Sequence, residues 1–164
     1  MASQVIDKHR EKAEIYHGDD ICKQKSIQLL TEMDLPKGLL PLNDMEEVGY
    51  NRETGFVWLK QKKTTEHTFQ KVGKKVSYAP EITAFVEPRK FKKLTGVKTK
   101  EILIWLTLSD IYIDDPSSGK ITFMTPSGLS RSLPVAAFEL EEDEGAAKSA
   151  EKEKKKKEEE AAMT

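Results

Sequence analysis

The sequence is poor in cysteine and in long apolar runs. The two shortages argue against a disulfide-stabilised protein and against a membrane-spanning one. Its single cysteine, Cys22, excludes an internal disulfide, which favours a reducing, intracellular compartment. No apolar run approaches the roughly 18 residues that a membrane-spanning helix needs, and the first residues lack the apolar core of a secretory signal. We therefore expect a cytoplasmic protein that is not secreted and has no transmembrane span. Peripheral attachment to a membrane stays open.

Recognisable catalytic and metal-binding spacings are also lacking. Cys22 lies on the apolar stripe of a predicted helix, and no spacing ties it to any of the three histidines. The serine cluster at 127–132 lacks the G-x-S-x-G pattern of a nucleophile elbow. The acidic pairs 19–20, 46–47 and 114–115 are expected at turns or on solvated faces, without the spacing of a calcium loop. We expect no catalytic residue, metal or cofactor.

The charges are unevenly distributed along the chain. Residues 60–100 carry twelve bases against three acids. Residues 141–164 carry nine acids and six lysines and no Leu, Ile, Val, Phe, Tyr or Trp. Such a segment cannot bury enough apolar surface to offset the entropy of ordering it. We expect a disordered or weakly helical tail over 141–164, which leaves a folded part of ordinary size.

Helical periodicity is confined to the first 38 residues. A first helix is predicted over residues 4–16 and a second over 21–33, before Pro36 and Gly38 end the helical region. The first would place Val5, His9, Ala13 and Tyr16 near one face. The second carries an apolar stripe of Cys22, Ser26, Leu29, Leu30 and Met33. We predict an N-terminal helical segment over residues 1–38.

From Leu39 the period changes from 3.6 to 2, which indicates strands. A hairpin is predicted from 45–50 and 55–61, with Phe56 and Trp58 facing one way and Val57 and Leu59 the other. Separate strands are expected over 76–79 and 81–87, and a short one over 91–94. The segment 101–114 is predicted as a strand covered on both sides at Ile102–Leu106, with a bend near Ser109.

The strands follow one another with short turns and no helix between them. This order favours a mainly β fold, an antiparallel barrel-like or sandwich domain of about seven to eight strands over residues 39–140, preceded by one or two helices.

The basic residues gather around the predicted strand 91–94. They are Arg89, Lys90, Lys92, Lys93, Lys98 and Lys100, with Phe91 among them. If the turns lie at one end of the barrel, these charges form one anion-binding surface with Phe91 as an interfacial contact. Its partner would be an anionic lipid or a protein; because arginine is scarce, nucleic acid is not expected. The plain alternative is a solvated face whose lysines protect edge strands from aggregation.

Short motifs along the chain resemble one known family. They are Pro36–Pro41, Val48–Tyr50, Thr54–Leu59, Val76–Tyr78, Leu94–Lys98, Leu103–Trp105 and Ile121–Phe123. In this order they are similar to the plant domain-of-unknown-function family 538, over about residues 5–140, and to its "smaller with variable branches"-like subgroup of trichome development. The resemblance implies a plant protein with a helix before a β-barrel-like domain. It also implies lipid binding or esterase-like action, without assigning a catalytic residue.

These patterns lead to one main hypothesis and two alternatives. We predict a non-enzymatic binding module for a hydrophobic or anionic lipid-like ligand, acting in development or stress response. The first alternative is an esterase-like hydrolase of lipids or pigments, with Ser130 or Cys22 as the residue to replace in a test. The second is a protein-interaction adaptor that docks through its helices or tail.

Overall fold

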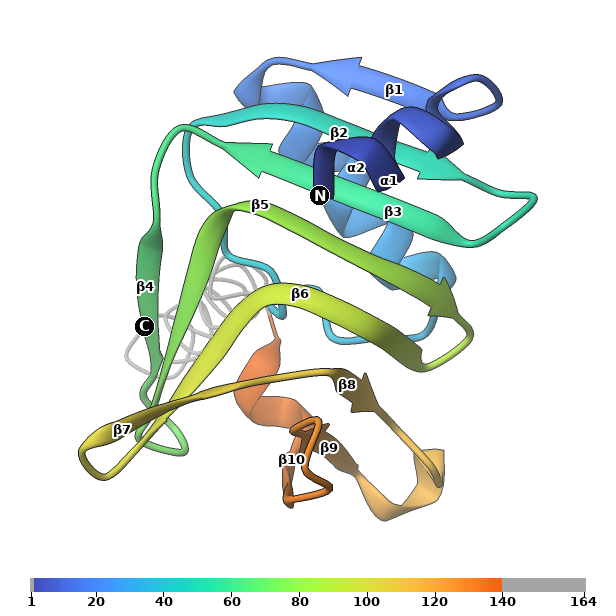
Figure 1. The fold of residues 1–164 in the computed structure, drawn as a ribbon. Coiled ribbons are helices and arrows are strands. Elements are labelled where there is room, and N and C mark those ends of the chain that lie inside the picture. Colours follow the sequence, from blue (N-terminus) through green and yellow to red (C-terminus); the bar gives the residue numbers. More distant parts are fainter. Residues whose placement is uncertain (1, 140–164) are drawn as a thin grey trace, which may run out of the picture.

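The computed structural model describes residues 2–139, which form one antiparallel sheet with two α-helices and two short 3₁₀ helices (Figure 1). The predicted charged tail lies outside these residues. The elements are α1 (Ala2–Arg10), β1 (Glu14–His17), α2 (Asp19–Glu32), β2 (Met45–Asn51), β3 (Phe56–Gln61), β4 (Thr65–Phe69), β5 (Lys74–Glu87), β6 (Lys90–Glu101), β7 (Ile104–Thr107), β8 (Asp110–Tyr112), η1 (Pro116–Ser118), β9 (Lys120–Met124), β10 (Ser130–Pro134) and η2 (Val135–Phe138).

The strands form a 10-stranded sheet in the order β1-β2-β3-β5-β6-β8-β9-β10, with β4 paired to β5 and β7 to β6. The mainly β class and the antiparallel pairing are confirmed, but the sheet does not close into a barrel. The two ends of this order, β1 and β10, do not pair with each other, and η2 follows β10 with Phe138 buried. Its ring packs against Phe69 of β4 and Phe123 of β9, with centroids 4.6 and 5.0 Å away. Side chains of η2 therefore bury the core between β4 and β9 without any strand pairing there.

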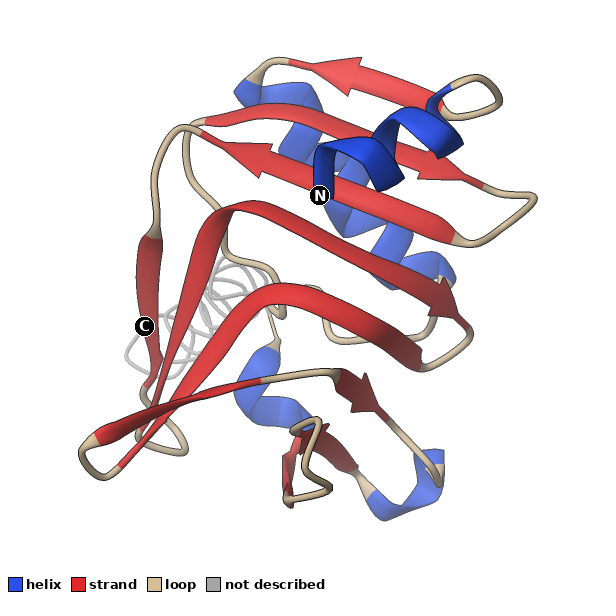
Figure 2. Cartoon of the chain, viewed as in Figure 1, coloured by secondary structure: helices blue, strands red, loops and turns tan. Residues whose placement is uncertain are grey.

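The two α-helices cover opposite faces of the β2–β3 part of the sheet (Figure 2). Val57 and Leu59 lie in the main core, which α2 joins through its own leucines. Phe56 and Trp58 lie in a second cluster with Ile6 of α1. The predicted alternation of this strand is confirmed, and it explains why all four side chains are buried.

The first predicted helix is wrong in its second half. It ends at Arg10, and Glu14–His17 forms β1 along the edge of β2, with Glu14 opposite Tyr50. Local helical spacing is overridden here because an exposed strand edge offers hydrogen-bond partners. The second helix is confirmed as α2, with its predicted stripe residues Cys22, Ser26, Leu29 and Leu30 buried.

Three strand predictions also need correction. Segments 76–79 and 81–87 are one strand, β5, and the predicted short strand 91–94 is the first part of the 12-residue β6. The bend predicted near Ser109, by contrast, is confirmed, because the chain leaves β7 at Thr107 and enters β8 at Asp110. The expected burial of Ile102–Leu106 on both sides is wrong, because the chain reverses there between β6 and β7.

Candidate functional site

Among the residues that the structure describes, the exposed large apolar side chains are concentrated at the end of the β6–β7 hairpin, called here the hairpin tip. It consists of Ile102, Leu103, Ile104 and Trp105, which are 90%, 87%, 60% and 37% exposed. Exposed apolar side chains that occur singly are ordinary, whereas a contiguous group indicates an interaction surface. The hairpin tip is therefore the first candidate site.

The backbone of the hairpin tip is strained to present these side chains. Glu101 pairs with Ile104, so Ile102 and Leu103 form a two-residue turn. Ile102 has a φ of 54°, in the left-handed region where a β-branched residue is an outlier. A glycine is the residue expected at such a first turn position. Strain of this kind is found at functional sites and supports a role for the exposed side chains.

Cationic side chains lie beside the hairpin tip. Lys98 is exposed on β6. Lys100 lies opposite Trp105, with its Nζ 5.9 Å from the centroid of the indole. Arg131 of β10 is 57% exposed and forms an ion pair with Glu101. The apolar end of the hairpin is therefore bordered by positive charge.

The structure divides the basic cluster predicted from the sequence. Lys98 and Lys100 lie near the hairpin tip, whereas Arg89, Lys90 and the Lys92–Lys93 pair lie at the opposite end of β6. Lys93 and Lys100 are separated by seven residue steps, which correspond to roughly 23 Å of extended strand. The lysines at the far end also have local partners: Lys92 pairs with Glu87 at 3.4 Å, and Lys90 and Lys93 lie over the rings of Tyr112 and Phe85.

Phe91 cannot make the interfacial contact predicted for it. Its side chain is 1% exposed and belongs to the main core. In β6 it lies between Val86 of β5 and Ile111 of β8, where alternation turns it inward while the flanking lysines turn outward. The exposed aromatic residue among cations is Trp105.

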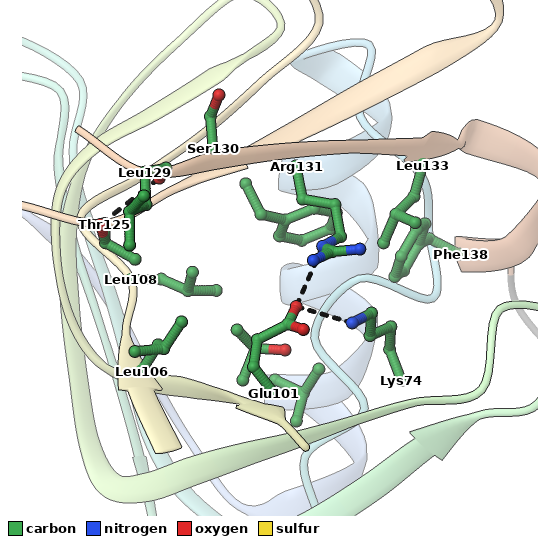
Figure 3. A pocket seen from close by; sticks show the side chains of 13 residues that line it. Lys74, Glu101, Leu106, Leu108, Thr125, Leu129, Ser130, Arg131, Leu133 and Phe138 are labelled. Carbon is green, nitrogen blue, oxygen red and sulfur yellow. Dashed lines mark hydrogen bonds and ion pairs between the residues drawn. The ribbon is translucent and has the colours of Figure 1, made fainter. Parts of the chain in front are cut away.

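A pocket of about 150 Å³ lies on the inner side of the sheet, next to β7 (Figure 3). Its apolar wall contains Val76, Leu106, Leu108, Phe123, Leu133 and Phe138. Three charged side chains, Lys74, Glu101 and Arg131, also line the pocket. Glu101 lies between Lys74 and Arg131. Glu101 Oε1 is 2.6 Å from Lys74 Nζ and 3.0 Å from Arg131 Nε. The group carries two cations and one anion, hence one net positive charge.

A second polar cluster surrounds Glu47, which is 7% exposed rather than solvated as predicted for the pair 46–47. Its carboxylate accepts hydrogen bonds from Arg10 at 2.8 and 3.1 Å and from Trp58 Nε1 at 2.9 Å, and it contacts His17 at 2.9 Å. Burial alone would raise the pKa of Glu47, but the hydrogen bonds from Arg10, Trp58 and His17 outweigh it and hold the pKa at about 2. This cluster ties α1 and β1 to the sheet.

The two nucleophiles of the hydrolase alternative differ in position. Cys22 is fully buried, and burial raises the pKa of its thiol, both of which oppose a nucleophilic role. Ser130 lies at the pocket but points away from it (Figure 3). Within residues 2–139, no cluster of three or more His, Cys, Asp or Glu side chains is arranged to hold a metal ion. None of the helices in this range is long and apolar enough to cross a membrane.

Fold and site together define a class: a mainly β protein with one open antiparallel sheet, helices on both of its faces and an apolar hairpin tip bordered by cations. The family model described as "Protein of unknown function, DUF538" matches residues 26–139, and the chain belongs to this family. No curated protein matches the chain, and no solved structure does. The resemblance drawn from the motifs is confirmed for the family, and the narrower subgroup stays a prediction.

Proposed function

We propose that this protein is a non-enzymatic binding module that attaches to anionic membrane surfaces through the hairpin tip. The observation that carries the proposal is the contiguous exposure of Ile102, Leu103 and Ile104 next to Lys100 and Arg131. At a membrane surface, aliphatic side chains enter the acyl region, and tryptophan lies at the level of the headgroups. Lysine stems extend so that their ammonium groups reach the phosphates. Trp105 and Lys100 are suited to these two roles.

The magnitudes favour reversible attachment. Full burial of one Ile or Leu side chain is worth roughly 1.5–3 kcal/mol, and each lysine near an anionic surface adds about 1 kcal/mol. The hairpin tip with Lys98 and Lys100 therefore supplies both an apolar and an electrostatic contribution. Neither contribution alone gives stable attachment, so binding should need anionic lipid and should weaken with salt.

The proposal also specifies where the protein acts and what it binds. The protein would act in the cytoplasm, peripheral to a membrane, and its ligand would be a lipid headgroup with the adjoining acyl region. Kinship with the "smaller with variable branches"-like subgroup, and a role in trichome development or stress response, rest on the order of the sequence motifs alone.

The first prediction concerns the apolar side chains. The double variant Ile102→Ser/Leu103→Ser should bind vesicles of phosphatidylcholine and phosphatidylserine about 100-fold more weakly, because roughly 3 kcal/mol of apolar transfer is lost. Flotation at low and moderate salt measures this. Ile21→Ser on α2, where Ile21 is 40% exposed, is the matched control and should bind like the wild type. Equal binding by the double variant and the control would contradict the proposal.

A charge comparison on one strand tests the same proposal. Lys98→Gln/Lys100→Gln should reduce both vesicle binding and its dependence on salt. Lys92→Gln/Lys93→Gln removes the same charge at the far end of β6 and should have a smaller effect, because screening limits attraction beyond about 10 Å. Equal loss in both pairs would favour the broader basic surface predicted from the sequence. If wild-type protein binds no vesicle, the protein-adaptor alternative becomes the better explanation of the exposed tip.

A third prediction separates the effect of Ile102 on stability from its effect on binding. Ile102→Gly should raise the free energy of unfolding by about 1 kcal/mol, because glycine adopts a positive φ without the left-handed penalty, and it should weaken vesicle binding. Urea denaturation and flotation measure the two effects. Leu103→Gly is the control: φ is not positive at this position, so binding should fall with no gain in stability. A loss of stability in Ile102→Gly would refute the assignment of strain to Ile102.

A further inference from the structure

Beyond membrane attachment, we infer that the pocket beside β7 binds a small monocarboxylate whose apolar part is an aromatic ring or a short aliphatic chain. Arg131 belongs both to the border of the hairpin tip and to the pocket, but this inference does not require membrane attachment, because the pocket lies on the inner side of the sheet and can be tested without vesicles. It rests on three observations: the size of the pocket, the nature of its wall and the arrangement of the charged group that lines it.

The size limits the apolar part of the ligand. The pocket measures about 150 Å³, and an apolar cavity of about this volume holds one benzene molecule. Leu106, Leu108 and Phe123 provide an aliphatic and aromatic wall around it. A ring or a chain of about six carbons fills this space, and the remainder of a long acyl chain would extend beyond it.

The three charged side chains of the pocket determine which charge the polar part of the ligand must carry. Glu101 is 22% exposed and is held by Lys74 and Arg131, so one positive charge is left uncompensated. Lys74 is 16% exposed and donates to Glu101. Arg131 forms its ion pair with Glu101 through Nε, at 3.0 Å, so its two terminal amino groups can bind a second carboxylate. It is 57% exposed, so an incoming anion can reach it.

Arginine recognises carboxylates through two parallel N–H donors. In Figure 3 the Arg131 side chain extends over the pocket, above Glu101 and between Leu108 and Leu133. A ligand carboxylate bound to the terminal amino groups of Arg131 would direct its apolar part toward Phe123 and Phe138. A neutral molecule of the same shape would gain the wall contacts but not the charged contact. A carboxylate without an apolar part would gain only the latter.

The test uses the full chain in vesicle-free buffer, with benzoate and hexanoate as probes. Isothermal titration calorimetry measures their binding, and NMR shifts of the pocket residues locate it. Benzyl alcohol and acetate are the two control ligands, and dodecanoate tests the size limit. We expect saturable binding of benzoate, hexanoate or both, at least 10-fold tighter than either control. Preference between the two probes identifies the apolar group as ring or chain. Binding no tighter than that of acetate, or tighter binding of dodecanoate, would overturn the inference.

Two variants locate the site. Arg131→Gln should weaken probe binding at least 10-fold, whereas Lys120→Gln, which removes an exposed charge from β9 outside the pocket lining, should have no effect. Leu106→Phe fills the pocket from a partly exposed position and should abolish binding while leaving Arg131 in place. Circular dichroism checks that each variant is folded. Unchanged binding by both pocket variants would place the probe elsewhere and refute the site.

Discussion

Replacing Gly49 with alanine should lower the free energy of unfolding by about 3 kcal/mol, because the site is overpacked by the added methyl group. Gly49 lies directly opposite Trp58 in the β2–β3 pair, and a Cβ at this position would overlap the six-membered ring of the indole. The ring cannot move aside, since Trp58 is fully buried and its Nε1 donates to Glu47 at 2.9 Å. A glycine inside a strand is otherwise unfavourable and indicates a close approach of this kind.

A double-mutant cycle distinguishes this overlap from a general effect of alanine in the strand. In the Trp58→Phe background the six-membered ring of the indole is absent, so Gly49→Ala should cost at least 1 kcal/mol less there. Urea denaturation of the four proteins measures the coupling. An equal cost of Gly49→Ala in both backgrounds would show that the Trp58 ring is not responsible.

Glu47→Gln should lower the free energy of unfolding by about 3 kcal/mol at pH 7, because it leaves the Arg10 cation without its buried partner. The pKa of Glu47 is about 2 in the folded protein, against about 4.5 when unfolded, and a difference of this size corresponds to about 3 kcal/mol. Since the folded-state pKa is depressed, the stabilisation is fully present above about pH 4.5. It is lost as the pH falls toward 2.

Denaturation from pH 7 down to pH 2.5 measures this dependence. The difference between the wild type and Glu47→Gln should be constant above pH 5 and should shrink below pH 4.5. Glu53→Gln is the matched control, because Glu53 forms an exposed pair with Lys12 at 3.4 Å, and exposed pairs contribute at most about 1 kcal/mol. If the two variants lose the same stability at pH 7, the Glu47 cluster does not anchor α1 to the sheet as its geometry indicates.

The Glu47 cluster also shows where pattern reading fails for charged residues. Glu46 and Glu47 are adjacent and look alike in the sequence, but strand alternation turns one outward and the other beneath α1. Two of its partners, Arg10 and His17, precede the segment 26–139 that matches the family model. Only the packing of α1 and β1 on β2 brings them together, so no spacing in the sequence could have indicated the contact.

The candidate sites also contain features that the sequence indicated and features that only the structure reveals. The basic cluster was visible in the sequence, but the length of β6 decides that Lys98 and Lys100, and not Lys93, lie near the hairpin tip. The pocket could not be anticipated, because its charged residues come from positions 74, 101 and 131, on three different strands. Distances between strands depend on pairing and curvature, which local periodicity does not contain.

The sequence by itself determined the mainly β class, the buried stripe of α2 and the alternation of Phe56–Leu59, because residue spacing reports directly on which side chains share a face. Only the tertiary structure decided that the sheet stays open and that Ile102–Trp105 is exposed. An apolar run has the same pattern in a strand covered on both sides and in an exposed turn. The two differ only in whether another part of the chain covers them, and that is a property of the packed fold.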